Sequence, residues 1–96
     1  MLWRQVLALV EAYRGNHAEA ELLGREAVAI SNRTDALNAQ GDALCDLAEV
    51  LSRAGRTDEA AAALEQALER YERKKNLAML AQVRPKLEEL RKAAPA

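Results

Sequence analysis

The side chains best able to do covalent or metal chemistry in this 96-residue chain are its single thiol, Cys45, and its single imidazole, His17. A catalytic thiolate needs an oriented base, and a zinc site needs three or four ligands. Neither residue has such neighbours in the sequence, so we interpret Cys45 as a half-buried helical thiol and His17 as a helix-start residue. Gly41 and Gly55 stand isolated in helical sequence and form no phosphate loop. We expect no catalytic residue, metal ligand or cofactor, and no enzyme.

Three carboxylates, those of Asp42, Asp46 and Glu49, recur at helical spacing and therefore share one face of a helix. Such a cluster could hold a cation or do acid–base chemistry. Nothing apolar nearby in the sequence would shift the pKa of these groups, so we favour a solvated polar face.

The basic side chains gather in the last third of the chain. Residues 1–69 carry twice as many acidic as basic side chains, and residues 70–96 carry an excess of basic ones. Tyr71 is the only aromatic residue in that basic segment, whereas nucleic-acid surfaces usually interleave several aromatics. We therefore regard nucleic-acid binding as the weaker interpretation and a charged end of the fold as the stronger one.

The elements that must position these groups are helices. Half of the residues are hydrophobic, only 3% are aromatic, and apolar residues recur every three or four positions. The pattern predicts five helices: one from residue 2 to about Tyr13, a second capped by Asn16 or His17, a third from Leu37 to about Ala54, a fourth from Thr57 and a fifth from Asn76. We expect Thr34 to cap the third helix, Gly55 to end it in a left-handed conformation, and Pro85 to kink or split the fifth.

The two halves of the chain repeat at a spacing of 40 residues. The matched pairs include the helix-ending glycines Gly15 and Gly55 and the glutamates Glu19 and Glu59. They also include small residues at which paired helices can approach closely: Ala20 and Ala60, Ala27 and Ala67. Self-similarity at such a period is typical of an α-solenoid. We predict one domain over 1–96, with repeat 1 at about 2–33, repeat 2 at about 34–75 and a capping helix at about 76–93.

The repeated positions resemble the tetratricopeptide repeat. The second repeat fills that family's slots with Leu44, Leu47, Ala48, Leu51, Gly55, Ala60, Leu64 and Ala67, and the first with Trp3 or Arg4, Leu7, Ala8, Val10, Gly15, Ala20, Leu23 and Ala27. The family's closing proline is absent, and a period of 40 exceeds the usual period of about 34 residues. The chain is similar to the long-repeat variety found in large bacterial signalling regulators, and residues 71–78 are similar to the closing segments of such arrays.

The resemblance implies an all-α antiparallel helix–turn–helix array whose function is to bind another protein. Its inner surface, made by the first helix of each repeat, would receive a partner's peptide. The corresponding residues are Gln5, Leu9, Ala12 and Tyr13 in repeat 1, and Asp42, Cys45, Asp46, Glu49 and Arg53 in repeat 2. Members that clamp a C-terminal carboxylate use lysine and asparagine there, so we expect that activity to be absent and a bound peptide to be basic.

The first helix has apolar residues on two faces, and only one face can pack on the second helix. We expect Trp3, Leu7 and Val10 to pack, and a second stripe to remain exposed in an isolated chain: Leu2, Val6, Leu9 and Tyr13. That stripe is either a homodimer contact, which makes self-association the alternative function, or the stump of a missing upstream repeat. In the fifth helix, Arg84 and Arg91 stand where the repeat would place the counterparts of Leu44 and Leu51. We therefore expect the array to end at this helix.

The cellular setting follows from what the sequence lacks. A single cysteine allows no internal disulfide, and residues 1–10 are too short and too interrupted for a membrane span or a signal peptide. We expect a cytoplasmic protein, the C-terminal part of a larger regulator, whose partner is a protein or peptide rather than a membrane.

Overall fold

The structure is a computed structural model that describes the backbone of residues 2–93 and the side chains of residues 6–92. Five helices follow one another: α1 Leu2–Tyr13, α2 His17–Ser31, α3 Leu37–Arg53, α4 Thr57–Lys74 and α5 Leu77–Ala93. The described part of the chain contains no strand. The predicted five-helix, all-α array is therefore confirmed.

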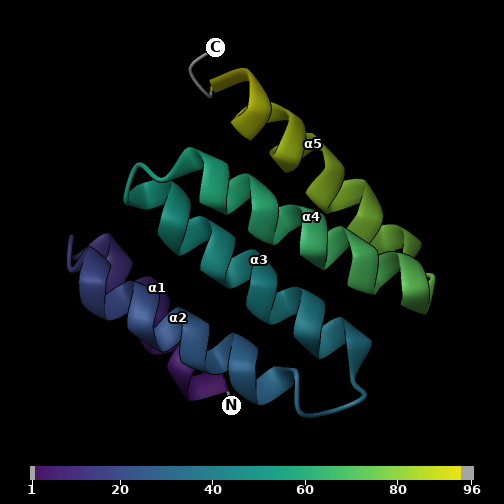
Figure 1. The fold of residues 1–96 in the computed structure, drawn as a ribbon, viewed down its shortest axis with the longest axis horizontal. Helices are drawn as coiled ribbons and strands as arrows, with labels where there is room; N and C mark the ends of the chain where they lie inside the picture. Colours follow the sequence, from purple (N-terminus) through teal and green to yellow (C-terminus); the bar gives the residue numbers. More distant parts are fainter. Residues whose placement is uncertain (1, 94–96) are drawn as a thin grey trace.

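The helices pack as successive antiparallel neighbours (Figure 1). Each packs against the next in sequence, and α1 also packs against α3. The α1–α2 pair and α5 lie at opposite ends, with the α3–α4 pair between them. This order makes α1 and α3 the first helices of the two predicted repeats, and α5 follows the second repeat.

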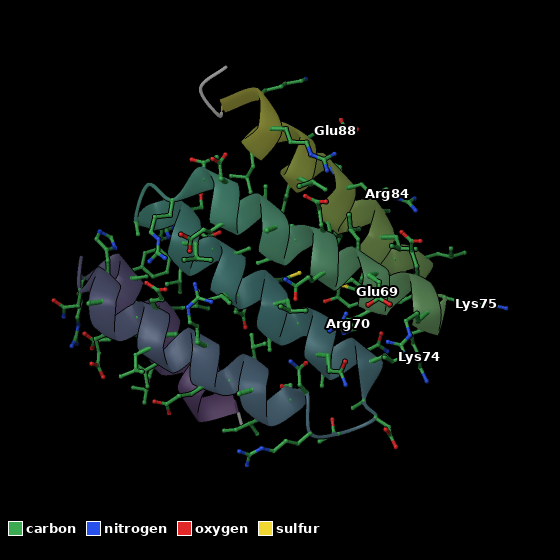
Figure 2. All side chains as sticks on the ribbon, in the orientation of Figure 1. Glu69, Arg70, Lys74, Lys75, Arg84 and Glu88 are labelled. Carbon is green, nitrogen blue, oxygen red and sulfur yellow. The ribbon has the colours of Figure 1, made fainter. Side chains whose placement is uncertain are left out.

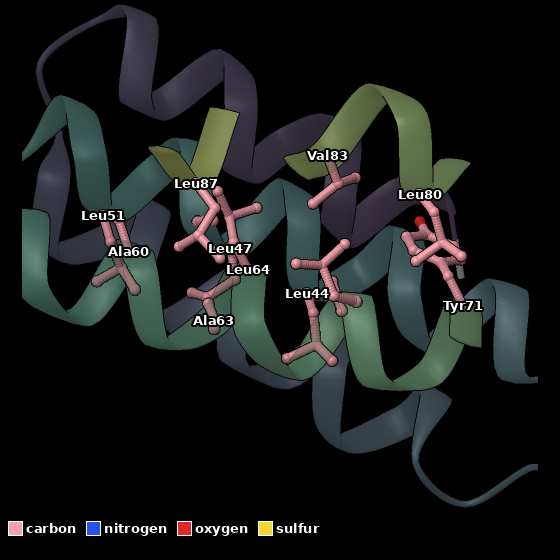
Figure 3. Packing of buried hydrophobic residues seen from close by; sticks show 13 residues of the cluster. Leu44, Leu47, Leu51, Ala60, Ala63, Leu64, Tyr71, Leu80, Val83 and Leu87 are labelled. Carbon is pink, nitrogen blue, oxygen red and sulfur yellow. The ribbon is translucent and has the colours of Figure 1, made fainter. Parts of the chain in front are cut away.

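Two hydrophobic clusters hold the array together. The larger joins α3, α4 and α5 through side chains that are all buried: Leu44, Leu47, Leu51, Ala60, Leu64, Ala67, Tyr71, Leu80, Val83 and Leu87 are among them (Figure 3). The smaller consists of Ala8, Ala12, Ala20 and Val50, so it joins α1 and α2 to α3. Because the alanines are small, the first two helices approach closely but bury little apolar surface.

Tight helix crossing explains Gly41, which lies inside α3. A Cβ at residue 41 would stand 2.6 Å from the ring of Tyr71 on α4, a distance that real Cβ atoms do not show. The helix runs unbroken from Leu37 through Gly41, as the apolar stripe predicts. Gly41 therefore lowers helix propensity but allows the packing of a fully buried tyrosine.

The turns confirm some cap assignments and correct others. Gly15 and Gly55 both have positive φ, at 84° and 80°, as expected of helix-ending glycines. The assignment of Thr34 as a helix cap is wrong: α3 begins at Leu37, and the Thr34 hydroxyl instead donates to the Ser31 carbonyl and accepts from the Ala36 amide. Asn16 occupies the N-cap position of α2, but its side chain donates to Glu11 at 2.6 Å and makes no cap hydrogen bond.

Pro85 does not split the last helix, because α5 is continuous from Leu77 to Ala93. The apolar residues of α5 differ in burial. Leu80 and Leu87 are buried and Val83 joins them, whereas Leu77 is exposed at the start of the helix.

An ion-pair network ties the two repeats together on their outer side. Glu21 on α2 accepts hydrogen bonds from Arg25, at 2.7 Å, and from Arg56 in the α3–α4 turn. Glu59 on α4 accepts from the same two arginines. These bonds hold the pKa of Glu21 below its ordinary value, the bond from Arg25 contributing most. Each pair is partly exposed, so its contribution to stability is small and depends on salt.

Candidate functional site

The candidate site is the surface formed by the first helix of each repeat together with α5. On α3 the buried side chains Leu44, Leu47 and Leu51 belong to the large hydrophobic cluster. The next face of α3 carries side chains that are exposed or half-buried: Asp42, Cys45, Asp46, Glu49 and Arg53. The five positions predicted for repeat 2 therefore lie together on one accessible face.

Arg53 connects the predicted residues of the two repeats. Its guanidinium carbon lies 3.9 Å from the centroid of the Tyr13 ring, and its Nε donates to Glu49 at 2.7 Å. Stacking of a guanidinium on an aromatic face is a favourable cation–π contact. Tyr13, Arg53 and Glu49 thus form a continuous polar and aromatic strip from the end of α1 to the last turns of α3.

A cleft of about 430 Å³ lies between α3 and α5. The wall from α3 consists of Cys45, Ala48, Glu49 and Ser52, and the wall from α5 consists of Lys86, Glu89 and Leu90. Leu64 from α4 closes the bottom, where it is 4% exposed. The cleft is therefore apolar in depth and charged at its rim.

Tyr71 anchors the adjoining part of α3. Its hydroxyl donates to the Asp42 carboxylate at 2.5 Å and lies 3.8 Å from the Cys45 sulfur. Burial, followed by the Asp42 hydrogen bond, raises the pKa of Tyr71 far above its ordinary value. One of the predicted surface carboxylates therefore also has a structural role, which the sequence did not indicate.

Cys45 is half-buried, as expected. Burial is the main cause that raises its pKa, and the neighbouring Asp42 and Asp46 raise it further. The hydrogen bond between Cys45 and Tyr71 and the charge of Lys86 lower this pKa. The balance opposes thiolate formation, which a nucleophile or metal ligand would need.

The described residues include neither a candidate metal site nor a candidate membrane-spanning helix. Among them, no three carboxylate, thiol or imidazole groups come together in a way that could hold a metal ion. His17 lies exposed at the start of α2 and does not line the α3–α5 cleft. No helix in the same part of the chain is long and apolar enough to cross a membrane.

The exposed apolar face of α1 differs from the predicted one. Val6 and Tyr13 are 50% and 66% exposed as predicted, but Leu9 is half-buried against the smaller cluster. The prediction that Leu7 and Val10 pack on α2 is wrong, since they are 43% and 36% exposed. The predicted residues Leu2 and Gln5, together with Trp3, have side chains outside the described residues.

The repeat itself explains why Leu7 and Val10 are exposed. Forty residues later stand Leu47 and Val50, which are buried between the two repeats. A Cβ at Gly24 of α2 would lie 3.1 Å from the Leu47 side chain, and Val50 packs against Ala8, Ala12 and Ala20. Among the described residues, no helix packs over Leu7 and Val10 in the same way.

The basic segment at the end of α4 is partly paired. Arg70 donates to Gln40 at 2.9 Å and forms an ion pair with Glu69, which also pairs with Arg73 (Figure 2). Lys74 and Lys75 extend into solvent at the end of the helix. Arg70 and Arg73 therefore pair with Glu69, whereas Lys74 and Lys75 lie at the exposed end of α4.

Sequence reasoning missed the contribution of α5 to this surface. Lys86 and Glu89 stand 40 residues after Asp46 and Glu49, so continuing the repeat into the capping helix would have placed them in the cleft. The prediction for this helix concerned Arg84 and Arg91, which were expected to end the array, and both are exposed.

Comparison with known proteins identifies the repeat. A family model described as "Tetratricopeptide repeat" matches residues 1–73, which include α1 to α3 and nearly all of α4. Neither the curated proteins nor the solved structures searched contain a significant match.

Proposed function

Because the chain belongs to the tetratricopeptide repeat family, whose members generally mediate protein–protein interaction, we propose that it binds a segment of another protein on the surface shared by α1, α3 and α5. The observation that carries this proposal is the cleft between α3 and α5. It lies beside the Tyr13–Arg53–Glu49 strip, so a single bound segment can contact both repeats and the capping helix.

We propose a binding function rather than a catalytic one. The family is an interaction scaffold, and burial raises the pKa of the one thiol in the cleft. A chain that binds a partner in an apolar cleft gains affinity from desolvation without needing a reactive group.

A substitution that fills the cleft with a large side chain tests the proposal. Peptides are first selected from a random library on the immobilised protein. Ser52→Trp places a large ring in the cleft and should weaken the selected peptides at least tenfold, as measured by fluorescence anisotropy. Glu72→Trp, on the exposed surface of α4, is the matched control and should bind normally. Equal binding by both variants, with helicity unchanged, would refute the proposed site.

We also propose a cellular setting for this domain. The period of 40 residues and the closing segment at 71–78 resemble arrays in large bacterial signalling regulators, which supports a role as the C-terminal part of such a regulator. The single cysteine supports a cytoplasmic location. The coding sequence on both sides of these residues, and fractionation of cells that express the protein, test the two statements.

A second candidate function is self-association through α1. The observation in its favour is an apolar patch of Val6, Leu7, Val10 and Tyr13, every member of which is exposed. A twofold pairing would let each copy cover the patch of the other. Sedimentation over a range of concentrations separates the candidates, because peptide binding needs only a monomer.

A further inference from the structure

We propose that the α3–α5 cleft selects a segment in which an apolar side chain stands next to lysine or arginine. This inference rests on the proposed binding function and adds the chemistry of the partner. Its grounds are the depth of the cleft, the charges at its rim and the charges along the adjoining face of α3.

The depth of the cleft calls for an apolar side chain. Its inner lining comes from Ala48, Leu64 and Leu90 together with the uncharged thiol of Cys45. Ala48 and Leu64 are almost fully buried, so they offer methyl groups and no hydrogen-bonding group at the bottom. A polar side chain placed there would lose its water without gaining a partner, whereas an apolar one would gain from desolvation.

The rim calls for a cation. Glu49 from α3 and Glu89 from α5 face the cleft from opposite walls, and Asp42 and Asp46 extend the carboxylates along α3. Among the described residues that line the cleft, Lys86 is the one cation.

A second cation, Arg53, lies nearby and is held between Glu49 and the Tyr13 ring. Over this described surface the carboxylates of α3 and α5 outnumber the two cations. The excess leaves a negative potential over the opening, which attracts a basic segment and repels an acidic one.

The positions of these groups set the spacing in the partner. One face of α3 carries four residues of the cleft on successive turns: Cys45, Ala48, Glu49 and Ser52. The carboxylate of Glu49 therefore lies next to Ala48, which belongs to the apolar lining. The cation of the bound segment therefore belongs one to three positions from its apolar side chain. The family's carboxylate-clamp type of recognition would need the opposite charge at this rim.

Cys45 provides a built-in reporter of occupancy. It is the single cysteine of the chain and it lines the cleft, so modification of the whole protein by a thiol reagent reports on that wall alone. A segment seated in the cleft must slow this modification. A segment bound elsewhere leaves the rate unchanged.

The experiment selects peptides from a random library on the full chain at low salt and scores two results, residue enrichment and protection of Cys45 from a maleimide. We expect the peptides that protect Cys45 to be enriched in lysine or arginine within three residues of leucine, isoleucine, methionine or phenylalanine. Glu89→Lys should weaken those peptides about tenfold, since it replaces an attraction with a repulsion. Glu88→Lys, one position away on the outer side of α5, makes the same charge change outside the cleft and should leave affinity within about twofold.

The outcomes separate this inference from the function on which it rests. If no selected peptide protects Cys45, the proposed binding site itself is refuted. If peptides protect Cys45 but are neutral or acidic, or if Glu89→Lys and Glu88→Lys act alike, the site stands and the proposed partner chemistry is overturned. Enrichment of basic peptides together with loss on Glu89→Lys alone supports both.

Discussion

Tyr71 packs its ring on Gly41 so closely that an added Cβ would stand 2.6 Å from both Cε1 and Cζ. This contact sets how near α3 and α4 approach, and it places the tyrosine hydroxyl beside Asp42 and Cys45. A glycine in the middle of a helix is thus the reason that the second repeat can bury its one aromatic residue.

Gly41→Ala should destabilise the protein by about 1–3 kcal/mol, because the ring must move and the surrounding core is tightly packed. Intrinsic propensity alone predicts the reverse sign, since alanine in a helix is favoured over glycine by about 1 kcal/mol. Gly24→Ala is the matched control. Its Cβ would meet the end of the flexible Leu47 side chain at 3.1 Å, so we expect a change near zero. Urea denaturation measures both, and equal effects would contradict the proposed role of Gly41.

Tyr71→Phe should change how stability depends on alkaline pH. The pKa of Tyr71 is raised in the folded protein, so above about pH 10 the unfolded chain loses this proton first and binds fewer protons. The free energy of unfolding of the wild type should then fall by up to about 1.4 kcal/mol per pH unit through this group.

The Tyr71→Phe variant lacks this fall in the free energy of unfolding at alkaline pH. At neutral pH we expect it to be less stable by about 1 kcal/mol, for the lost hydrogen bond to Asp42, and the difference should close between about pH 10 and 11. Tyr13→Phe, at an exposed ring, is the control. A difference that stays constant with pH would mean that Tyr71 ionises normally in the folded protein.

Gly55→Val should destabilise the protein through the backbone alone. The φ of Gly55 is 80°, and no atom lies within 4 Å of the place that a Cβ would occupy, so the cost is conformational. For a β-branched residue it amounts to about 1–2 kcal/mol. Gly55→Asn, whose side chain tolerates this conformation better, should cost clearly less. Thermal melts with the same midpoint for both variants would remove the left-handed assignment.

Self-association should depend on Leu7 and Val10. Burying a leucine contributes roughly 1.5–3 kcal/mol, so pairing two such patches can support a dimer after association costs are met. We expect sedimentation to show a dimer that Leu7→Glu with Val10→Glu converts to a folded monomer. Leu22→Glu changes an exposed leucine on α2 and should leave the dimer intact. A wild-type monomer at high concentration would rule out this second candidate function.

The fold was largely predictable because the signals that specify it are local. Apolar spacing predicted five helices, and glycines at positions 15 and 55 marked two of their ends. The errors arose where tertiary contacts decide. Thr34 lies three residues before the start of α3 at Leu37, so its hydroxyl bonds within the α2–α3 loop and does not cap the helix. The helix α5 continues through Pro85, and its apolar face packs on α4.

The sequence predicted the part of the candidate surface that lies on α3, but it did not predict the part that lies on α5. The carboxylates of α3 share a face by spacing alone, but their relation to Lys86, Glu89 and Leu90 depends on how α5 crosses α4. The sequence did not show that α1 would pack mainly through Ala8 and Ala12 rather than through either of its two apolar stripes. That choice depends on α2 and α3, which together cover Ala8 and Ala12 and leave Leu7 and Val10 exposed.

The division of the core into two clusters has a consequence for cooperativity. The α3–α4–α5 cluster contains leucines and a tyrosine, whereas the cluster that attaches α1 and α2 depends on three alanines and Val50. The first repeat should therefore open at lower free energy than the second, and its amide hydrogens should exchange sooner. A segment bound across Tyr13 and the α3–α5 cleft would contact both units at once. Binding would then turn two weakly coupled units into a single one, so occupancy could be followed as slower exchange in α1, a helix that forms no part of the cleft.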